Sequence, residues 1–322
     1  MIVAEYLDSP VNVPGTQGEM LRDADMSGFT SWRAGGKADH LYTPVDLDDL
    51  CAFLKTVDAD EPLLFIGLGS NLLVRDGGVR GTVIHLHSAL RKIDLEQRRT
   101  HSGDSDRVTP FGVIYAEAGV ASPKVARFAA THDLVGAEFL AGIPGTVGGA
   151  LAMNAGCYGH ETWEFVTQVL TINRRGEIHR RTPKEYRVSY RHVEPGDPAI
   201  PHEWFVGAWF MFPRGDGAKS RLEIKNLLEK RIASQPLNLP NSGSVFRNPP
   251  GDFSARLIES CGLKGEKIGG AQVSEKHANF IVNIGGATAT DIESLIERIQ
   301  ARVADKTGVK LQREVCIVGE KI

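Results

Sequence analysis

One run in the last third of the chain combines residue types that could carry out chemistry. It reads Pro240-Asn241-Ser242-Gly243-Ser244-Val245-Phe246-Arg247-Asn248-Pro249. Here Ser244 stands between a glycine and an Arg-Asn pair inside a proline-bounded loop, an arrangement typical of a ligand site. A polar turn is the alternative, because Gly, Asn and Ser all favour turns. Other segments of the chain that combine glycine with polar residues favour the ligand site.

Two glycine-rich segments accompany it. The first, Gly67-Leu68-Gly69-Ser70-Asn71, can bring several main-chain N–H groups and two polar side chains to an anion such as a pyrophosphate. It is not a Walker loop, because no Gly-Lys-Ser/Thr follows, and Leu72 stands where a dinucleotide fingerprint needs its third glycine. The second, Ala141-Gly142-Ile143-Pro144-Gly145-Thr146-Val147-Gly148-Gly149, carries little side-chain bulk. A flat ring could lie against it, although a tight buried turn would also explain the pattern.

Charged and aromatic residues supply the remaining chemistry. Arg187, after Tyr186, could hold a carboxylate at two points, but a solvated surface arginine is the alternative. Glu314 lies next to an apolar segment and is open to the same two interpretations. His277 has no partner at metal-ligand spacing, and the sequence predicts no metal site.

The elements that must position these residues alternate between strands and helices. Helices are predicted from Asp46 to about Lys55, from a Ser122-Pro123 cap to His132, around 222–232, at 254–261, and from a capping box at Thr290-Asp291-Ile292-Glu293. Strands are predicted at 63–66, 82–86, 113–116, 166–172, 177–179, 204–212 and 315–318, and a loop or hairpin at 94–107. The mixture indicates an α+β fold.

Composition limits the class of protein. The chain has 322 residues, 42% of them hydrophobic, a net charge of -3 and a pI near 6.4. Neither a nucleic-acid surface nor a membrane surface held by charge is indicated, and no apolar run approaches the ~18 residues of a membrane span. The four cysteines are widely spaced, so we expect neither zinc nor disulfides, and a cytoplasmic location.

The segments named above, taken in order with Arg313-Glu314-Val315, resemble the UDP-N-acetylenolpyruvylglucosamine reductase (MurB) family from about Thr30 to Val318. The resemblance implies a two-part FAD-binding fold of the vanillyl-alcohol-oxidase type and a C-terminal α+β substrate domain. It also implies noncovalent FAD, NADPH as cosubstrate and UDP-N-acetylglucosamine enolpyruvate as substrate. The product would be UDP-N-acetylmuramate for peptidoglycan synthesis.

The resemblance further implies roles for individual residues. The catalytic positions are Arg187, which stabilises charge on the substrate carboxylate, Ser244, which donates a proton, and Glu314, which polarises or protonates the same region. The expected FAD contacts are Gly67, Gly69, Ser70, Asn71, Gly142, Ile143, Gly148, Gly149 and Asn154. The expected substrate contacts are Tyr158, Tyr186, Asn248 and His277.

The expected organisation is a leader at 1–20, an FAD-binding part at 21–81 completed by 309–322, a second FAD-binding part at 82–218 and a substrate domain at 219–308. The region from Arg191 to Gln235 contains no tyrosine, which indicates the type without a tyrosine-bearing substrate loop. Cys157 and Tyr190 depart from the family pattern and affect the expected closure over the substrate. An FAD-linked alcohol oxidase or dehydrogenase, and a noncatalytic nucleotide-sugar or flavin-binding module, remain as alternatives.

Overall fold

The first layer of the fold is a four-stranded sheet. It belongs to a computed structural model that describes residues 13–96 and 110–322. The strand order is β1-β2-β5-β3, with the bounds β1 (Glu19–Asp25), β2 (Lys37–Thr43), β3 (Leu63–Ile66) and β5 (Val79–His85). Both β2 and β3 run parallel to β5, whereas β1 is antiparallel to β2. The expected leader therefore ends early, because β1 begins at Glu19; residues 1–12 lie outside the described part.

Helix α1 (Leu47–Leu54) joins β2 to β3, and it confirms the predicted helix. It begins where expected, because the Asp46 carboxylate accepts a hydrogen bond from the Asp49 N–H at 2.8 Å. Strand β3 has the predicted bounds and leads directly into the first glycine loop. The sheet therefore presents that loop at the end of a buried strand.

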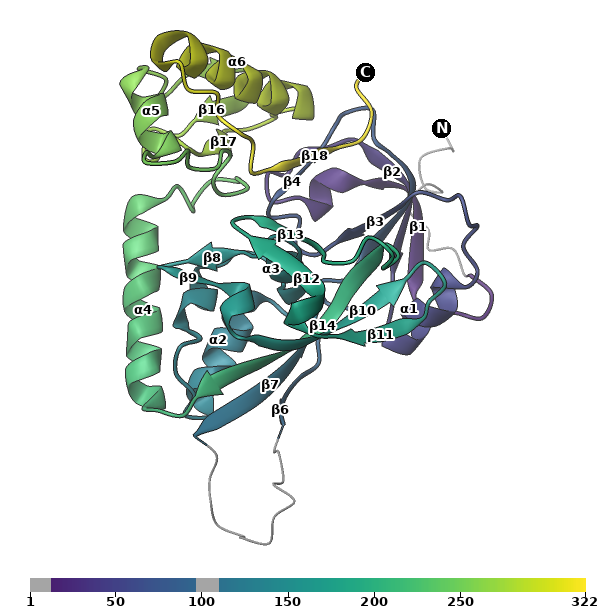
Figure 1. Cartoon of the computed structure of the whole chain (residues 1–322). Helices are drawn as coiled ribbons and strands as arrows, with labels where there is room; N and C mark the ends of the chain where they lie inside the picture. Colours follow the sequence, from purple (N-terminus) through teal and green to yellow (C-terminus); the bar gives the residue numbers. More distant parts are fainter. Residues whose placement is uncertain (1–12, 97–109) are drawn as a thin grey trace, which may run out of the picture.

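The second layer is an antiparallel five-stranded sheet below the first (Figure 1). Its order is β11-β10-β14-β7-β6, with the bounds β6 (Ile93–Glu96), β7 (Phe111–Glu117), β10 (Val166–Asn173), β11 (Ile178–Arg181) and β14 (Glu203–Pro213). The strands predicted at 113–116, 166–172, 177–179 and 204–212 lie within or overlap β7, β10, β11 and β14. Most of the predicted loop at 94–107 lies outside the described residues. Strand β5 extends past residue 82, so the expected start of the second part falls inside a strand of the first.

Helices cover one face of this second sheet. They are α2 (Ser122–Thr131), the 3-10 helix η2 (Glu138–Gly142), α3 (Val147–Ala152) and α4 (Gly217–Ser234). Figure 1 shows α4 running along the edge of the molecule toward the C-terminal region. Two short hairpins complete this layer: β8 (Gly156–Cys157) with β9 (His160–Glu161), and β12 (Tyr186–Ser189) with β13 (His192–Pro195). The remaining 3-10 helices are η1 (Met26–Phe29), η3 (Thr162–Glu164) and η4 (Pro183–Glu185).

The C-terminal region is a small three-stranded sheet with two helices. Its elements are α5 (Ser254–Ser260), β15 (Lys267–Ile268), β16 (Ala271–Val273), β17 (Ile281–Asn283) and α6 (Ala289–Thr307). One face of α6 is buried, through Ile292, Leu295, Ile296, Ile299 and Val303. Strand β18 (Cys316–Val318) then returns to the first layer and pairs in parallel with β4 (Leu72–Val74).

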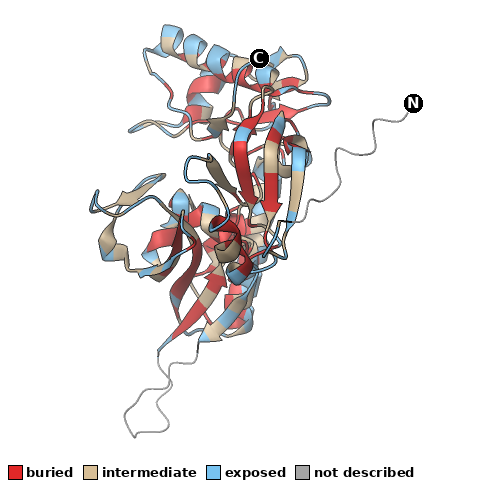
Figure 2. Cartoon of the chain, turned by 90° about the vertical axis from the view of Figure 1, so that its right-hand side faces the viewer, coloured by how far each residue is buried: buried red, intermediate tan, exposed pale blue. Residues whose placement is uncertain are grey.

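The C-terminal region shares its core with the N-terminal segment. Trp32 is fully buried, and it packs with Leu73 among the side chains of α5, α6 and the small sheet. Its indole Nε1 donates to the Ile281 carbonyl at 2.8 Å, and its own carbonyl accepts from Asn283 Nδ2 at 2.9 Å. Figure 2 shows buried residues continuing through the strands between the two regions. The two regions are therefore one packed unit.

An ionic contact reinforces this unit at the start of α6. The Arg75 guanidinium binds the nearly buried Glu293 carboxylate through two hydrogen bonds of 2.9 Å. The neighbouring Asp76 accepts from the N–H groups of Ala289 and Thr290 and from the Thr290 hydroxyl. A paired charge in a bidentate geometry holds its partners more precisely than a single contact does.

Two predicted helix caps are wrong. The last helix is capped by Thr288, whose hydroxyl accepts from the Asp291 N–H, because Asp76 occupies the hydroxyl and N–H of Thr290. The helix predicted to be capped by Ser122 has Ala121 at its N-cap. The Ser122 N–H instead donates to the Gly145 carbonyl of the second glycine loop. In both cases a long-range contact replaces the local one.

Candidate active site

The first glycine loop requires glycine at one position. Gly69 has φ +61°, and a Cβ there would lie 2.0 Å from the Phe29 carbonyl oxygen. The Ser31 N–H donates to the Gly69 carbonyl at 3.1 Å. At the other end of the loop, Asn71 Nδ2 donates to the Glu314 carbonyl at 3.1 Å. The loop is thus held between an N-terminal turn and the segment that carries Glu314.

The second glycine loop faces the first. A Cβ on Gly67 would lie 2.3 Å from the Thr146 hydroxyl, and a Cβ on Gly145 would lie 3.2 Å from the Ser70 hydroxyl. Helix α3 begins at Val147 with Thr146 at its N-cap, so Gly148 and Gly149 lie in its first turn. The two segments that the sequence singled out separately are therefore in contact across the two sheets.

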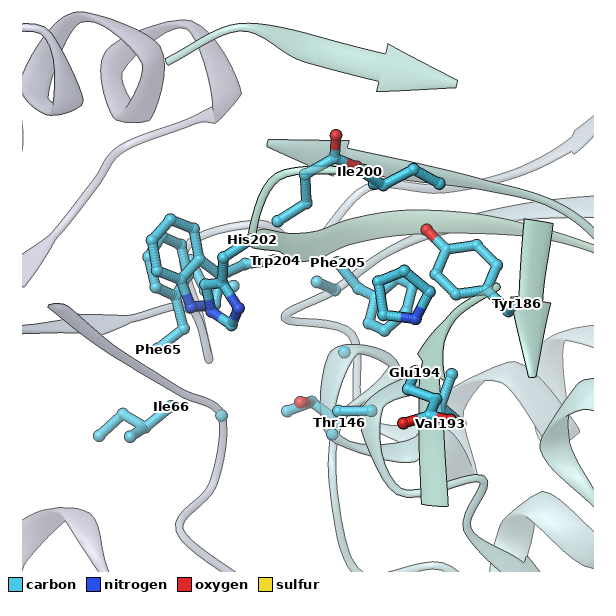
Figure 3. A pocket seen from close by; sticks show the side chains of 18 of the residues that line it. Phe65, Ile66, Thr146, Tyr186, Val193, Glu194, Ile200, His202, Trp204 and Phe205 are labelled. Atoms are coloured by element: carbon cyan, nitrogen blue, oxygen red, sulfur yellow. The ribbon is translucent and has the colours of Figure 1, made fainter. Parts of the chain in front are cut away.

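A cavity of about 350 Å³ lies beside this contact. The main chain of Gly67, Gly148 and Gly149 forms part of its wall, and its aromatic lining residues are Phe65, Tyr186, His202, Trp204 and Phe205. Figure 3 shows Phe65, His202 and Trp204 gathered at one end and Tyr186 with Phe205 at the other. Burial raises the pKa of Tyr186, so its hydroxyl stays protonated. A wall of bare main chain and flat rings fits part of a dinucleotide cofactor such as FAD.

Gly149 gives the clearest test of this cavity. A Cβ there would meet only the Thr146 hydroxyl, at 3.9 Å, so the space beyond it is open. We expect Gly149→Val to lower the flavin content of the purified protein several-fold while the apoprotein melts at an unchanged temperature. The added bulk enters the cavity, whereas a helical position tolerates a residue other than glycine. Flavin content and thermal melting, measured together, check this.

Gly69→Val is the matched comparison. It would meet main-chain atoms that cannot move away, and its backbone conformation is unfavourable for a branched residue. We expect it to lower apoprotein stability as well as flavin content. Equal flavin retention in Gly149→Val and the parent would remove this cavity from the cofactor site.

The serine loop lies against the segment that carries Glu314. Phe246 forms an antiparallel bridge with Arg313, and the Glu314 N–H donates to the Val245 carbonyl at 2.8 Å. Asn279 fixes the loop from behind, because its side chain accepts from the Phe246 N–H and donates to the Phe246 carbonyl. Ser244 is half-buried at the start of this ladder. Two of the expected catalytic residues are therefore neighbours.

Glu314 binds an arginine that the sequence prediction missed. Arg191 Nε donates to Glu314 Oε1 at 2.7 Å, and both side chains are more than four-fifths buried. The other guanidinium nitrogens of Arg191 donate to the Asn154 and Gly156 carbonyls at 3.4 and 3.2 Å. Burial raises the pKa of Glu314, although the charge of Arg191 acts in the opposite direction. A perturbed carboxyl beside a buried cation is a common feature of catalytic sites.

The structure does not bring Arg187 to this group. Its side chain is 63% exposed, binds Glu194 Oε1 at 2.8 Å and donates to the Gly196 carbonyl at 3.1 Å. Arg187 lies on β12, whereas Arg191 lies at the tip of the same hairpin with φ +55°. The signal that could have found it is the repeated dipeptide, because Tyr190-Arg191 follows Tyr186-Arg187 after four residues. Only the second pair reaches Glu314.

Other expected contacts have partners within the protein. Tyr158 Oη donates to the Leu227 carbonyl at 2.7 Å, and Asn248 Oδ1 accepts from the Ser254 N–H at 3.1 Å. Asn154 is buried and donates to Glu161 and to the Ser189 carbonyl, which supports the hairpin tip. His277 is half-buried, its buried Nδ1 has no partner among the described residues, and partial burial lowers the pKa of the ring.

Two of the expected FAD contacts, Gly142 and Ile143, do not line the cavity. Gly142 packs under Cys157 and Tyr158, where a Cβ would approach their side chains to 2.6 and 2.7 Å. Ile143 is part of the core beneath the second sheet. Both therefore support the glycine loop without lining the cavity.

Two absences concern the described residues alone. Within 13–96 and 110–322, no three His, Cys, Asp or Glu side chains are grouped to hold a metal ion. Over the same ranges, no helix combines the length and the apolar character needed to cross a membrane.

The buried state of Glu314 predicts a pH effect on stability. Its folded pKa is raised above the ~4.3 of an unfolded chain, so its contribution is present below the unfolded pKa and is lost as the pH rises through the folded pKa. Glu314→Gln removes this titration. We therefore expect the melting temperature of the variant, relative to the parent, to rise as the pH increases from the ~4.3 of the unfolded chain through the raised folded pKa of Glu314. A relative melting temperature that falls over this range would mean that the ion pair outweighs burial.

Comparisons with known proteins agree with this arrangement. The family model for an FAD binding domain matches residues 38–182, and the one for the C-terminal domain of UDP-N-acetylenolpyruvoylglucosamine reductase matches residues 235–318. The UDP-N-acetylenolpyruvoylglucosamine reductase of Thiobacillus denitrificans is 59% identical over 98% of this chain and 99% of its own length. That of Nitrosospira multiformis is 55% identical, over 95% and 90% respectively.

A solved structure extends the comparison to the fold. The crystal structure of UDP-N-acetylenolpyruvylglucosamine reductase (MurB) from Thermus caldophilus matches with a TM-score of 0.75 at 28% identity, and it covers 94% of this chain and 98% of its own. The identity, the coverage and the shared fold confirm the resemblance that the motifs indicated. The chain belongs to the UDP-N-acetylenolpyruvoylglucosamine reductase family.

Proposed function

We propose that this chain reduces UDP-N-acetylglucosamine enolpyruvate to UDP-N-acetylmuramate with electrons from NADPH, using noncovalently bound FAD. This is the activity of its family, and it belongs to peptidoglycan precursor synthesis. The observation that carries the proposal is the grouping of Ser244, Glu314 and Arg191 around one short ladder, next to the glycine-lined cavity. The two other function classes considered from the sequence do not account for that grouping.

The residues of the cavity fit the cofactor. We assign FAD to the space lined by Gly67, Thr146, Gly148 and Gly149 and to the adjoining loop at 69–71. Bound there, FAD supplies hydride transfer between NADPH and the enolpyruvyl group. The main-chain N–H groups of the first loop would face its pyrophosphate. Gly142, Ile143 and Asn154 are proposed to shape the cavity from behind.

The chain's own residues handle charge and protons. We assign to Arg191, in place of Arg187, the binding of the substrate carboxylate and of the negative charge that develops beside it. The Ser244 hydroxyl has no hydrogen-bond partner among the described residues and is proposed to donate a proton to the neighbouring carbon. Glu314, with its raised pKa, can hold a proton or polarise the same centre. Tyr158, Tyr186, Asn248 and His277 stay predicted substrate contacts.

The organisation of the chain and its location complete the proposal. We propose two FAD-binding parts and a substrate domain at 219–308, with the boundaries expected at 21–81 with 309–322 and at 82–218 shifted so that β1 and β5 lie whole in the first part. We also propose a cytoplasmic location, which the four free thiols support, because disulfides are rare in that compartment. Fractionation of cells that express the tagged chain tests the location.

One experiment separates this function from its rivals. Purified protein should be yellow, lose its colour with NADPH, and regain it without oxygen when UDP-N-acetylglucosamine enolpyruvate is added. Acid precipitation should release all the flavin. Oxygen consumption with an alcohol would indicate an oxidase, and a yellow protein that NADPH does not bleach would indicate a binding module.

A further inference from the structure

Glu314 has a second arginine on the same face of its ladder. The Arg247 N–H donates to the Gln312 carbonyl at 2.9 Å, and the Glu314 N–H donates to the Val245 carbonyl at 2.8 Å, on either side of the bridge between Phe246 and Arg313. Alternation along paired strands therefore places the side chains of Arg247 and Glu314 on one face, as diagonal neighbours. Long side chains reach one another at the ~7–8 Å of such a diagonal.

Arg247 has an unused hydrogen-bond donor at this point. One terminal nitrogen donates to the Arg191 carbonyl at 3.2 Å, whereas its Nε is buried without a partner among the described residues. A buried N–H without an acceptor is costly, and such groups are few in folded proteins. Burial raises the pKa of Glu314, and the charges of Arg191 and Arg247 both act against this rise. The unused donor therefore lies close to a carboxylate that another arginine holds.

Substrate binding changes what Arg191 can do. Three of the five N–H groups of its guanidinium donate to Glu314 and to the carbonyls of Asn154 and Gly156, and the one on Nε is held by Glu314. A side-on two-point contact with the carboxylate of the substrate, through Nε and one terminal nitrogen, therefore requires Arg191 to release Glu314. If Glu314 were released alone, a buried carboxylate would lose its cation, which is strongly unfavourable.

On the basis of the proposed function, we propose that Arg247 is a positioning residue that receives the Glu314 carboxylate on its free Nε–H when Arg191 turns to the substrate carboxylate. Arg247 touches neither substrate nor cofactor in this arrangement. It lets the Glu314 carboxylate pass from Arg191 to Arg247, so that this buried carboxylate always has a cationic partner. Substitution of Arg247 should therefore weaken ligand binding only when both Glu314 and the ligand carry a carboxylate.

The test compares two ligands that differ in that carboxylate. UDP-N-acetylmuramate carries it and UDP-N-acetylglucosamine does not, and the binding of each to the oxidised, FAD-loaded enzyme is measured by calorimetry. Arg247→Gln should weaken the first ligand about tenfold, the size of one charge-assisted hydrogen bond, and leave the second unchanged. In a Glu314→Gln background, the same substitution should cost little with either ligand.

Controls separate this role from a structural one. Arg313→Gln removes a neighbouring exposed charge and should change neither affinity. Arg247→Lys, which keeps the charge, should recover part of the loss, and it replaces Arg247→Gln if that variant does not fold. Equal weakening of both ligands, or an undiminished loss in the Glu314→Gln background, would overturn the proposal. A parent enzyme that is bleached by NADPH yet shows no preference for the carboxylate ligand would overturn it while leaving the proposed function standing.

Discussion

In a Ser244→Ala variant, NADPH should bleach the flavin at close to the parent rate, and the enolpyruvyl substrate should restore the colour about 10²–10⁴-fold more slowly. The first phase does not use the hydroxyl. The second ends with protonation of carbon, which loses its positioned acid. The substitution removes one oxygen from a half-buried loop position, so folding and FAD content should stay close to those of the parent. Rapid mixing without oxygen measures the two phases separately.

Ser242 provides the matched control for this prediction. It lies two residues earlier, is 4% exposed, and its hydroxyl has no partner among the described residues. Ser242→Ala should therefore leave both phases unchanged. If Ser244→Ala slowed the two phases equally, the cause would be damage to the pocket, and a normal second phase would exclude Ser244 as the proton donor.

The second large effect distinguishes the two arginines of the hairpin. Arg191→Lys should slow the substrate-dependent phase by about 10²-fold or more, because an ammonium cannot reproduce a planar two-point contact with a carboxylate. Arg187→Lys should leave that phase within about twofold, since Arg187 forms only an exposed ion pair with Glu194. The two variants carry the same substitution at positions four residues apart. A difference between their single-turnover rates in the substrate-dependent phase therefore reflects position alone.

The reverse result would restore the assignment made from the sequence. A slow Arg187→Lys variant beside a normal Arg191→Lys variant would mean that the hairpin rearranges when substrate binds. Flavin content and melting temperature should be measured in both variants, because Arg191 also binds the Asn154 and Gly156 carbonyls. A loss of flavin in Arg191→Lys would point to disorder of the site.

The sequence predicted elements better than it predicted contacts between them. Strand β3 and the two glycine loops follow from local patterns, because a buried strand and a glycine turn are specified by neighbouring residues. The errors have a common cause. Thr290 is occupied by Asp76, Ser122 bonds to the second glycine loop, and the missed contact of Arg191 depends on where a hairpin tip meets Glu314. Each depends on residues far away in the sequence.

The shared core around Trp32 determines where the site can open. The indole joins the N-terminal segment to the C-terminal region, and the contact between Arg75 and Glu293 joins them again at α6. The first glycine loop and the serine loop therefore belong to one packed frame. The hairpin tip at Arg191 joins β12 and β13, which form a two-stranded sheet of their own, and it meets that frame through polar contacts with Glu314 and Arg247. We therefore expect entry of substrate and release of product to displace the hairpin tip, and residues at the base of the hairpin to affect the rate of both.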